Sequence, residues 1–233
     1  TLVDKGEPGR ETSFGNAGII QREGVRPHAF PRDLHTLMQV GLHLSVAARY
    51  APLALPKLAP PLLRYWWESS PDHYRRVVEQ YAPLIGRSII AHSDFIEACG
   101  PDAEKLISRY GWHLAFRTQE KLDAEMRKAK EDHDRFGISY EVMDWNRLKA
   151  AEPDLIGNLV GAIHWTDPWT VSDPGALVTQ YFKLFEKLGG TFVKGAGKKL
   201  TPDANGWTGE AEGQILKSRE VVIALGPWAP DGL

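Results

Sequence analysis

The first acidic residue of the chain stands where it could bind a nucleotide cofactor. Asp4 follows the apolar run Thr1-Leu2-Val3 and precedes the polar turn at Lys5-Gly6, a pattern that predicts the end of a buried strand. A carboxylate at the end of the second strand of a nucleotide-binding α/β unit accepts hydrogen bonds from a ribose hydroxyl. The alternative is an ordinary turn acid, because the sequence lacks the glycine fingerprint that would support a nucleotide site.

A segment dense in small polar residues follows this acid. Residues 9–18 read GRETSFGNAG. Glycine lets a backbone approach a ligand closely, and the N–H groups and short side chains of such a segment can bind an anion. The alternative is a tight turn of Ser, Gly and Asn. Because such a turn needs only about four residues, the length of the segment favours a ligand-binding loop.

A second turn of small residues lies near the other end of the sequence. Residues 221–225 are apolar and mostly β-branched, and Gly226, Pro227 and Trp228 follow them. The pattern predicts a buried strand whose small terminal residues leave room for a cofactor phosphate. A plain strand that ends in a Gly-Pro turn fits the same residues equally well.

A third candidate segment, residues 163–174, combines indole, imidazole and carboxylate groups. His164, Trp165 and Trp169 could line a substrate pocket where the middle of the chain returns to a nucleotide-binding part. The alternative places both tryptophans in a core and His164 on a strand that faces solvent. For Asp173 we favour the role of a helix N-cap, because Asp-Pro before a helical pattern is typical of a cap.

Composition and charge exclude several classes of protein. The 233 residues are 42% hydrophobic and 25% charged, with a net charge of −2, so no electrostatic argument favours a nucleic acid or an anionic membrane as the main partner. The histidines show no metal-ligand spacing, and we expect no metal site. The single cysteine, Cys99, cannot form a disulfide within the chain. No apolar run is long enough to span a bilayer.

Apolar periodicity predicts strands that alternate with helices, and hence an α/β or α+β fold. Residues 71–98 are expected to form one helix bent at Pro83, and the proline-rich residues 52–61 a rigid connection. Further helices are expected over residues 31–44, 118–136, 144–151 and 173–188. Further strands are expected over residues 112–117, 139–143, 160–166 and 191–194, and a hairpin within residues 206–222.

Two of these segments resemble one known family. Thr1-Leu2-Val3-Asp4 with residues 8–20 resembles the second strand and the FAD-contacting loop of the D-amino-acid oxidase/dehydrogenase superfamily, and is most similar to the bacterial small-subunit-type D-amino-acid dehydrogenases. Residues 222–228 resemble a later strand of this superfamily, where an Ala-x-Gly-x-Trp turn passes near the flavin. The order of the segments and the long insertion between them also match.

The resemblance implies roles for individual residues. Asp4 would bind the adenosine ribose, and Gly197 would present its backbone to the adenine. The residues implied along the pyrophosphate are Arg10, Thr12 and Ser13. Those implied beside or over the isoalloxazine ring are Asn16, Ala17, Gly18, Ala224, Gly226 and Trp228.

The resemblance also implies an organisation. Residues 1–30 and 171–233 would form parts of a Rossmann-like FAD-binding domain, and residues 31–170 an inserted helical and β-sheet substrate domain. The Gly-x-Gly-x-x-Gly turn is expected before Thr1 and a glycine-rich flavin-contacting segment after Leu233. We therefore expect an interior piece of a longer protein, with an incomplete FAD site.

The activity implied for the parent protein is FAD-dependent oxidative deamination of a D-amino acid, with a quinone or oxygen as electron acceptor. Other substrates left open are small amines such as sarcosine, glycine or hydroxyproline. A non-catalytic fragment or partner subunit is the alternative from another class, because a fold does not fix a function. The expected location is the cytoplasm, either in solution or peripherally at the inner membrane of a bacterium.

Overall fold

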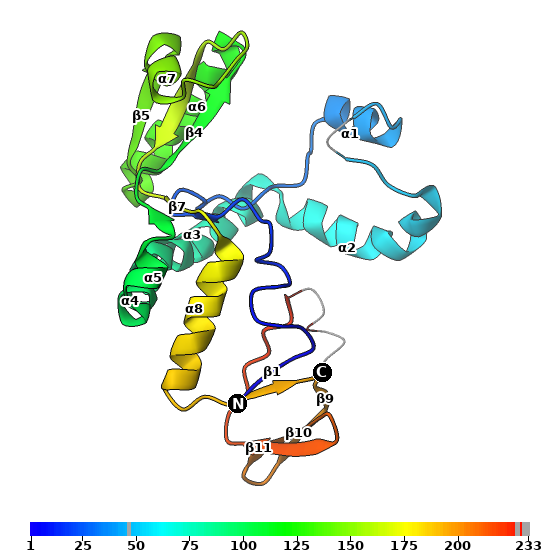
Figure 1. Ribbon diagram of the computed structural model, residues 1–233. Coiled ribbons are helices and arrows are strands. Elements are labelled where there is room, and N and C mark those ends of the chain that lie inside the picture. The colour runs from blue at the N-terminus through cyan, green and yellow to red at the C-terminus, as the bar shows by residue number, and fades with distance from the viewer. Residues whose placement is uncertain (46–47, 227–228, 230–233) are drawn as a thin grey trace. The chain divides into compact units, whose positions relative to one another are not determined.

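The structure, a computed structural model, describes residues 1–45, 48–226 and 229 (Figure 1). The chain divides into two compact units. Unit 1 comprises residues 1–20, 91–109 and those from 169 on, and unit 2 comprises residues 21–90 and 110–168. Both units contain helices and strands, and the mixed helix-and-strand class expected from the sequence is confirmed.

Unit 1 contains a parallel strand pair built from distant parts of the sequence. Leu2 of strand β1 lies opposite Phe192 of β8, and Asp4 lies opposite Lys194. Helix α8 leads into β8, as expected for a parallel connection. Two antiparallel sheets accompany this pair, in the orders β11-β10-β9 and β2-β7-β3. The elements of the unit are β1 (Leu2–Asp4), β2 (Ile19–Ile20), α5 (Pro101–Glu104), β3 (Ile107–Ser108), β7 (Trp169–Val171), α8 (Pro174–Lys187), β8 (Phe192–Lys194), β9 (Lys198–Asp203), β10 (Gly206–Ala211) and β11 (Gln214–Ser218), together with α4 (Ser88–Cys99) from Ala91 on.

Unit 2 is centred on the antiparallel sheet β4-β6-β5. Every residue of the central strand β6 is buried, and its side chains alternate between two cores, as the pleat requires. Ile163 and Trp165 pack in the larger core with residues of α6, while Ala162 packs with Leu148 of α7. The elements of this layer are β4 (Trp112–Phe116), α6 (Gln119–Phe136), β5 (Tyr140–Asp144), α7 (Trp145–Ala151) and β6 (Gly161–Trp165).

Four more helical segments precede this sheet within unit 2. They are α1 (Leu34–Gly41), the 3-10 turn η1 (Pro52–Ala54), α2 (Leu55–Glu68) and α3 (Pro71–Gly86). Asp33 caps α1 by accepting a hydrogen bond from the Thr36 N–H at 2.8 Å. Helix α3 begins at Pro71, as expected, with Ser70 at the N-cap position.

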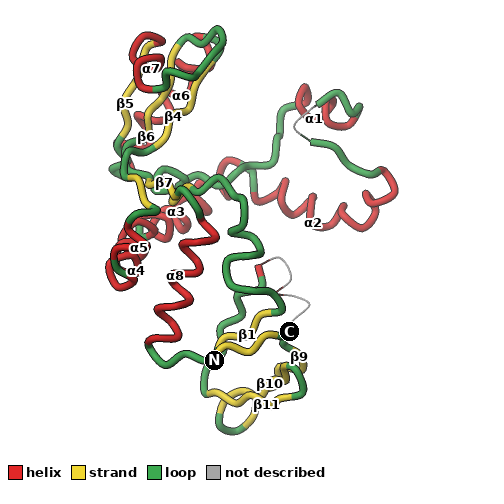
Figure 2. Tube along the Cα trace, in the orientation of Figure 1, coloured by secondary structure: helices red, strands yellow, loops and turns green. Residues whose placement is uncertain are grey.

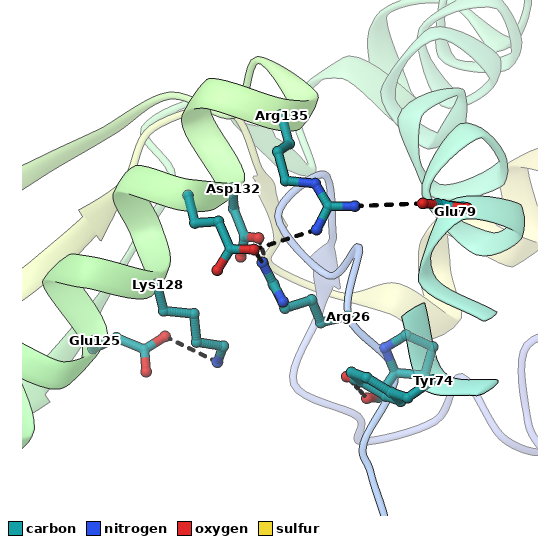
Figure 3. A network of polar contacts seen from close by, with 9 residues as sticks. Arg26, Tyr74, Glu79, Glu125, Lys128, Asp132 and Arg135 are labelled. Atoms are coloured by element: carbon teal, nitrogen blue, oxygen red, sulfur yellow. Dashed lines mark hydrogen bonds and ion pairs between the residues drawn. The ribbon is translucent and has the colours of Figure 1, made fainter. Parts of the chain in front are cut away.

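An ion-pair network ties an irregular segment of unit 2 to helices α3 and α6 (Figure 3). The Arg26 Nε lies 2.5 Å from Asp132 Oδ1, and the Arg26 Nη2 lies 2.9 Å from Glu131 Oε1. The Tyr74 hydroxyl donates to the Pro27 carbonyl at 2.6 Å. Burial raises the pKa of Asp132 despite its Arg26 partner, whereas the hydrogen bond from Arg26 lowers the pKa of Glu131.

Three predictions about elements are wrong. Residues 221–225 form no strand and are mostly exposed. No described strand pairs with them, and an apolar run alone does not provide the backbone hydrogen bonds of a sheet. Residues 52–61 are not a rigid connection, since α2 begins at Leu55 and holds Pro60 and Pro61 inside it. The single helix expected over residues 71–98 is instead two helices, α3 and α4, which are separated at Arg87.

Candidate functional site

Asp4 lies at the carboxyl end of β1, next to the turn into the following loop. Its Oδ1 accepts a hydrogen bond from the Gly6 N–H at 2.8 Å, and its carbonyl accepts one from the Gly195 N–H at 2.7 Å. The side chain is exposed. The backbone is therefore fixed by β8, while the carboxylate remains accessible to a ligand hydroxyl.

The loop between β1 and β2 runs without regular structure, as Figure 2 shows. Two of its glycines approach the chain's own backbone. A Cβ added to Gly9 would lie 2.3 Å from the Gly175 carbonyl oxygen, and one added to Gly18 would lie 2.2 Å from the Val171 carbonyl oxygen. Both glycines have positive φ. The loop therefore packs closely on the start of α8 at Gly9 and on β7 at Gly18, a use of these glycines that sequence reasoning missed.

The remaining predicted residues of this loop are spread along its surface. Thr12, Asn16 and Ala17 are exposed and Ser13 is half-buried, while Gly18 is buried. Asn16 Oδ1 accepts a hydrogen bond from the Gly18 N–H at 2.8 Å. Gly18 in turn accepts a hydrogen bond at its carbonyl from the Val171 N–H at 2.6 Å. The loop therefore enters β2 in one defined conformation.

A cavity of about 230 Å³ lies between this loop and the first turns of α8. Arg10 lines it, with its guanidinium 5.4 Å from the centre of the Phe14 ring. Asp173 also lines it and accepts a hydrogen bond from the Ala176 N–H at 2.8 Å. The helix terminus is thus already capped by a carboxylate, as predicted for Asp173, and Arg10 is the cation available to an anionic ligand here.

The other predicted cofactor residues are placed differently. Gly197 is exposed, and a Cβ added to it would lie 3.9 Å from Val3 Cγ1, so it lies beside β1. Ala224 and Gly226 are exposed and belong to no strand, and Trp228 lies outside the described residues. The structure therefore brings Gly197 to the β1 edge that carries Asp4.

His164 and Trp165 belong to the interior of unit 2. The His164 Nε2 lies 2.6 Å from the Tyr110 carbonyl oxygen, and its ring centre lies 4.5 Å from that of His113. His164 is only 7% exposed, so the alternative in which it faces solvent is wrong. Trp165 packs in the larger core.

Trp169 belongs to unit 1 and is half-buried in β7. The Arg109 guanidinium lies 4.3 Å from the centre of its ring. Arg109 also forms a two-point ion pair with Glu104, which raises the pKa of Arg109. Because the Arg109 charge is already paired with Glu104, the guanidinium in this conformation serves to pack against the Trp169 indole.

Comparison with known proteins places this arrangement in a family. The family model described as FAD dependent oxidoreductase matches residues 1–233. The chain belongs to the FAD dependent oxidoreductase family. The D-amino acid dehydrogenase of Methylobacterium nodulans is 27% identical over 99% of this chain and 55% of its own length. The enzyme of the same name from Methylobacterium radiotolerans is 29% identical over 95% of this chain and 54% of its length.

Solved structures show the same fold. Glycine oxidase from Geobacillus kaustophilus has a TM-score of 0.62 at 18% identity, over 99% of this chain and 49% of that chain. L-amino acid deaminase from Proteus myxofaciens has a TM-score of 0.62 at 14% identity, over 97% of this chain and 40% of that chain. The chain thus spans about half the length of the relatives it matches, and the family's cofactor is FAD.

The described residues around β1 fit part of an FAD site. An exposed carboxylate at the end of a parallel strand suits a ribose, and the fastened loop after it offers Arg10, Thr12 and Ser13 to a phosphate. The fit is weaker at the other end, because residues 221–226 lack the strand that would hold Ala224 and Gly226 in place.

A polar pair that sequence reasoning missed lies between α4 and α8 in unit 1. The His92 Nδ1 lies 2.7 Å from the Tyr181 hydroxyl, beside a small cavity that Phe95 and Leu184 also line. Burial raises the pKa of Tyr181 to about 12 and lowers the pKa of His92. No sequence signal pointed to this pair, since its members are far apart along the chain.

Two absences hold for the residues that the structure describes. They contain no group of three or more His, Cys, Asp or Glu residues that could hold a metal ion. They also contain no helix that is long and apolar enough to cross a membrane.

Proposed function

We propose that this chain is part of an FAD-dependent enzyme that oxidises D-amino acids to imino acids, which hydrolyse to keto acids and ammonia. The observation that carries the proposal is the family match over residues 1–233, together with two relatives that are both D-amino acid dehydrogenases and align with nearly all of the chain. Bound FAD would supply the redox chemistry by accepting a hydride from the amino-acid Cα.

The residues of unit 1 would hold the cofactor. Asp4 would accept hydrogen bonds from the ribose, and Arg10 would lie along the pyrophosphate with Thr12 and Ser13. The fastening of Gly9 and Gly18 to the chain's own backbone would keep this loop in shape before the cofactor binds. A preformed loop avoids the entropy cost of ordering it during binding. The other residues proposed to contact the cofactor are Asn16, Ala17, Gly18, Gly197, Ala224, Gly226 and Trp228.

The rest of the chain would serve the substrate. In the proposed organisation, residues 31–170 form the substrate part and residues 1–30 and 171–233 the FAD-binding part. His164, Trp165 and Trp169 remain our candidates near the substrate. The burial of His164 and Trp165 favours a role in supporting a pocket wall rather than open contact with solvent. Hydride transfer needs an oriented amine and exclusion of water, and no protein nucleophile.

The test is flavin reduction in the complete protein without oxygen. The purified protein is mixed anaerobically with single D-amino acids, their L-enantiomers, glycine or sarcosine, and flavin absorbance is followed. We expect D-amino acids to bleach the flavin and their L-enantiomers to leave it oxidised. Bleaching by glycine or sarcosine alone would move the substrate to a small amine. A protein that contains flavin but is reduced by none of these amines would contradict the proposed activity.

A further inference from the structure

The tip of the β10–β11 hairpin, in the orange part of the ribbon in Figure 1, carries a glutamate in an uncommon backbone conformation. The strands pair up to Ala211 and Gln214, so Glu212 and Gly213 alone form the turn. Their φ angles are 48° and 75°, as a hairpin turn of this length requires. Asparagine or aspartate is more usual at the first of these positions, because a short polar side chain can form a local hydrogen bond there. A glutamate in this conformation therefore calls for a functional explanation.

The Glu212 side chain folds back onto the end of the parallel strand pair β1-β8. A Cβ added to Gly195 would lie 2.4 Å from Glu212 Cγ and 2.8 Å from Glu212 Oε1. Gly195 is buried, and its N–H donates to the Asp4 carbonyl at 2.7 Å. The contact therefore places the Glu212 carboxylate at the carboxyl end of β1 and β8, the edge at which ligands of open α/β sheets bind.

The Glu212 carboxylate is available to a ligand at this edge. Among the residues that the structure describes, none donates a hydrogen bond to it or forms an ion pair with it. Glu210, two residues earlier on the same hairpin, is different, because Lys199 Nζ donates to its Oε2 at 2.8 Å. An ionised carboxylate accepts hydrogen bonds and donates none. The ligand group that suits Glu212 is therefore a hydrogen-bond donor, and not a phosphate.

The chemistry of FAD supplies one such donor, and this step rests on the proposed function. The ribose of FAD links its adenine to its pyrophosphate. If Asp4 binds the ribose and Arg10 lies along the pyrophosphate, the adenine lies on the other side of Asp4, toward the turn at Gly195 and Gly197. The 6-amino group carries the N–H donors of an adenine that is joined to a ribose.

We propose that Glu212 accepts a hydrogen bond from the 6-amino group of the FAD adenine and so selects adenine at this end of the cofactor. A carboxylate discriminates in both directions, because it attracts an amino group and repels a keto oxygen at the same position of a purine. Its place away from Arg10 also keeps its negative charge apart from that of the pyrophosphate. Glu212 is thus a specificity residue for the cofactor, with no part in the hydride transfer.

The test compares two cofactors in titrations of the complete apoprotein, followed by the flavin fluorescence. One is FAD, and the other is an FAD analogue whose purine base lacks the 6-amino group. We expect the unchanged protein to bind FAD roughly 10- to 100-fold more tightly than the analogue, the range for a hydrogen bond to a charged group. Glu212→Ala should weaken the binding of FAD by that factor and leave the binding of the analogue unchanged.

Two further variants separate the proposed hydrogen bond from the shape of the hairpin. Glu212→Gln keeps a neutral acceptor oxygen and should restore part of the preference for FAD, because a hydrogen bond to a neutral group is weaker than one to a charged group. Glu210→Ala removes the other carboxylate of the hairpin and should keep the full preference.

Three results would overturn the proposal. The first is a Glu212→Ala protein that still prefers FAD to the analogue. The second is an equal loss of affinity for both cofactors in Glu212→Ala, which would show that the side chain only shapes the turn on Gly195. The third is an apoprotein that binds neither cofactor, which would overturn the proposed function as well. A protein that shows the expected preference, but whose flavin is not reduced by D-amino acids, would support the role of Glu212 and contradict the proposed activity alone.

Discussion

Replacing Gly18 by alanine tests whether the loop after β1 is held in shape by close backbone packing. Gly18 has a φ of 64°, and a Cβ there would lie 2.2 Å from the Val171 carbonyl oxygen. Gly15 of the same loop has a φ of 70°, but a Cβ there would meet no described atom within 4 Å. The two substitutions therefore share the backbone strain and differ in the clash.

The expected magnitudes follow from these two terms. A left-handed backbone costs an alanine about 1–2 kcal/mol, which is the whole effect expected for Gly15→Ala. In Gly18→Ala the clash also forces apart the hydrogen bond from the Val171 N–H to the Gly18 carbonyl. Losing a buried hydrogen bond of this kind costs a further 1–3 kcal/mol or so. For Gly18→Ala, the two costs together should thus lower the free energy of unfolding by about 2–5 kcal/mol.

The assay is thermal unfolding of the complete protein, with extracted FAD measured in the same preparations. We expect the melting temperature of Gly18→Ala to fall at least twice as far as that of Gly15→Ala, and its FAD content to be lower. Equal shifts in the two variants would refute the reasoning, because they would show that the contact with Val171 does not constrain the loop.

Two further predictions concern α8 and α4. Asp173→Ala removes the cap of α8 and should lower the free energy of unfolding by about 0.5–2 kcal/mol, whereas the neighbouring change Ser172→Ala should have a smaller effect in the same urea titration. Burial lowers the pKa of His92 in the folded state, below its unfolded value of 6.5. The contribution of neutral His92 to the free energy of unfolding is therefore fully present above the unfolded pKa, and it is lost as pH falls through the lower folded pKa. A melting-temperature profile against pH should therefore decline on the acid side, and His92→Gln should flatten that decline; an unchanged profile would contradict the linkage.

Local signals in the sequence predicted much of the fold. The cap at Asp173 is confirmed, and Asp144 caps α7 in the same way, since each cap depends on a carboxylate and an N–H group three residues away. The helix that ends at Phe136 and the buried strand β6 follow from periodicity over a single segment. Patterns of this kind are largely complete within a few turns of chain, which is why sequence alone predicts them.

Features that depend on distant partners were not predictable in the same way. Residues 221–225 have the composition of a strand, but a strand also needs a neighbouring backbone to pair with it. The contacts of Gly9 with Gly175 and of Gly18 with Val171 join segments far apart in sequence. Sequence reasoning assigned the small residues of this loop to a ligand, and only the structure shows that two of them also serve internal packing.

Asp4 gives the most direct test of the proposed FAD site, because the contact between Asp4 and the FAD ribose is the central residue assignment of that site. Asp203 offers a matched control: it is also exposed, and its Oδ1 likewise accepts a hydrogen bond from the N–H two residues on. The measurement is FAD titration of the apoprotein of Asp4→Ala and Asp203→Ala, made in the complete protein. We predict a dissociation constant about 5- to 30-fold higher for Asp4→Ala, matching a loss of about 1–2 kcal/mol, and no change for Asp203→Ala. Equal FAD affinity in the two variants would contradict the account.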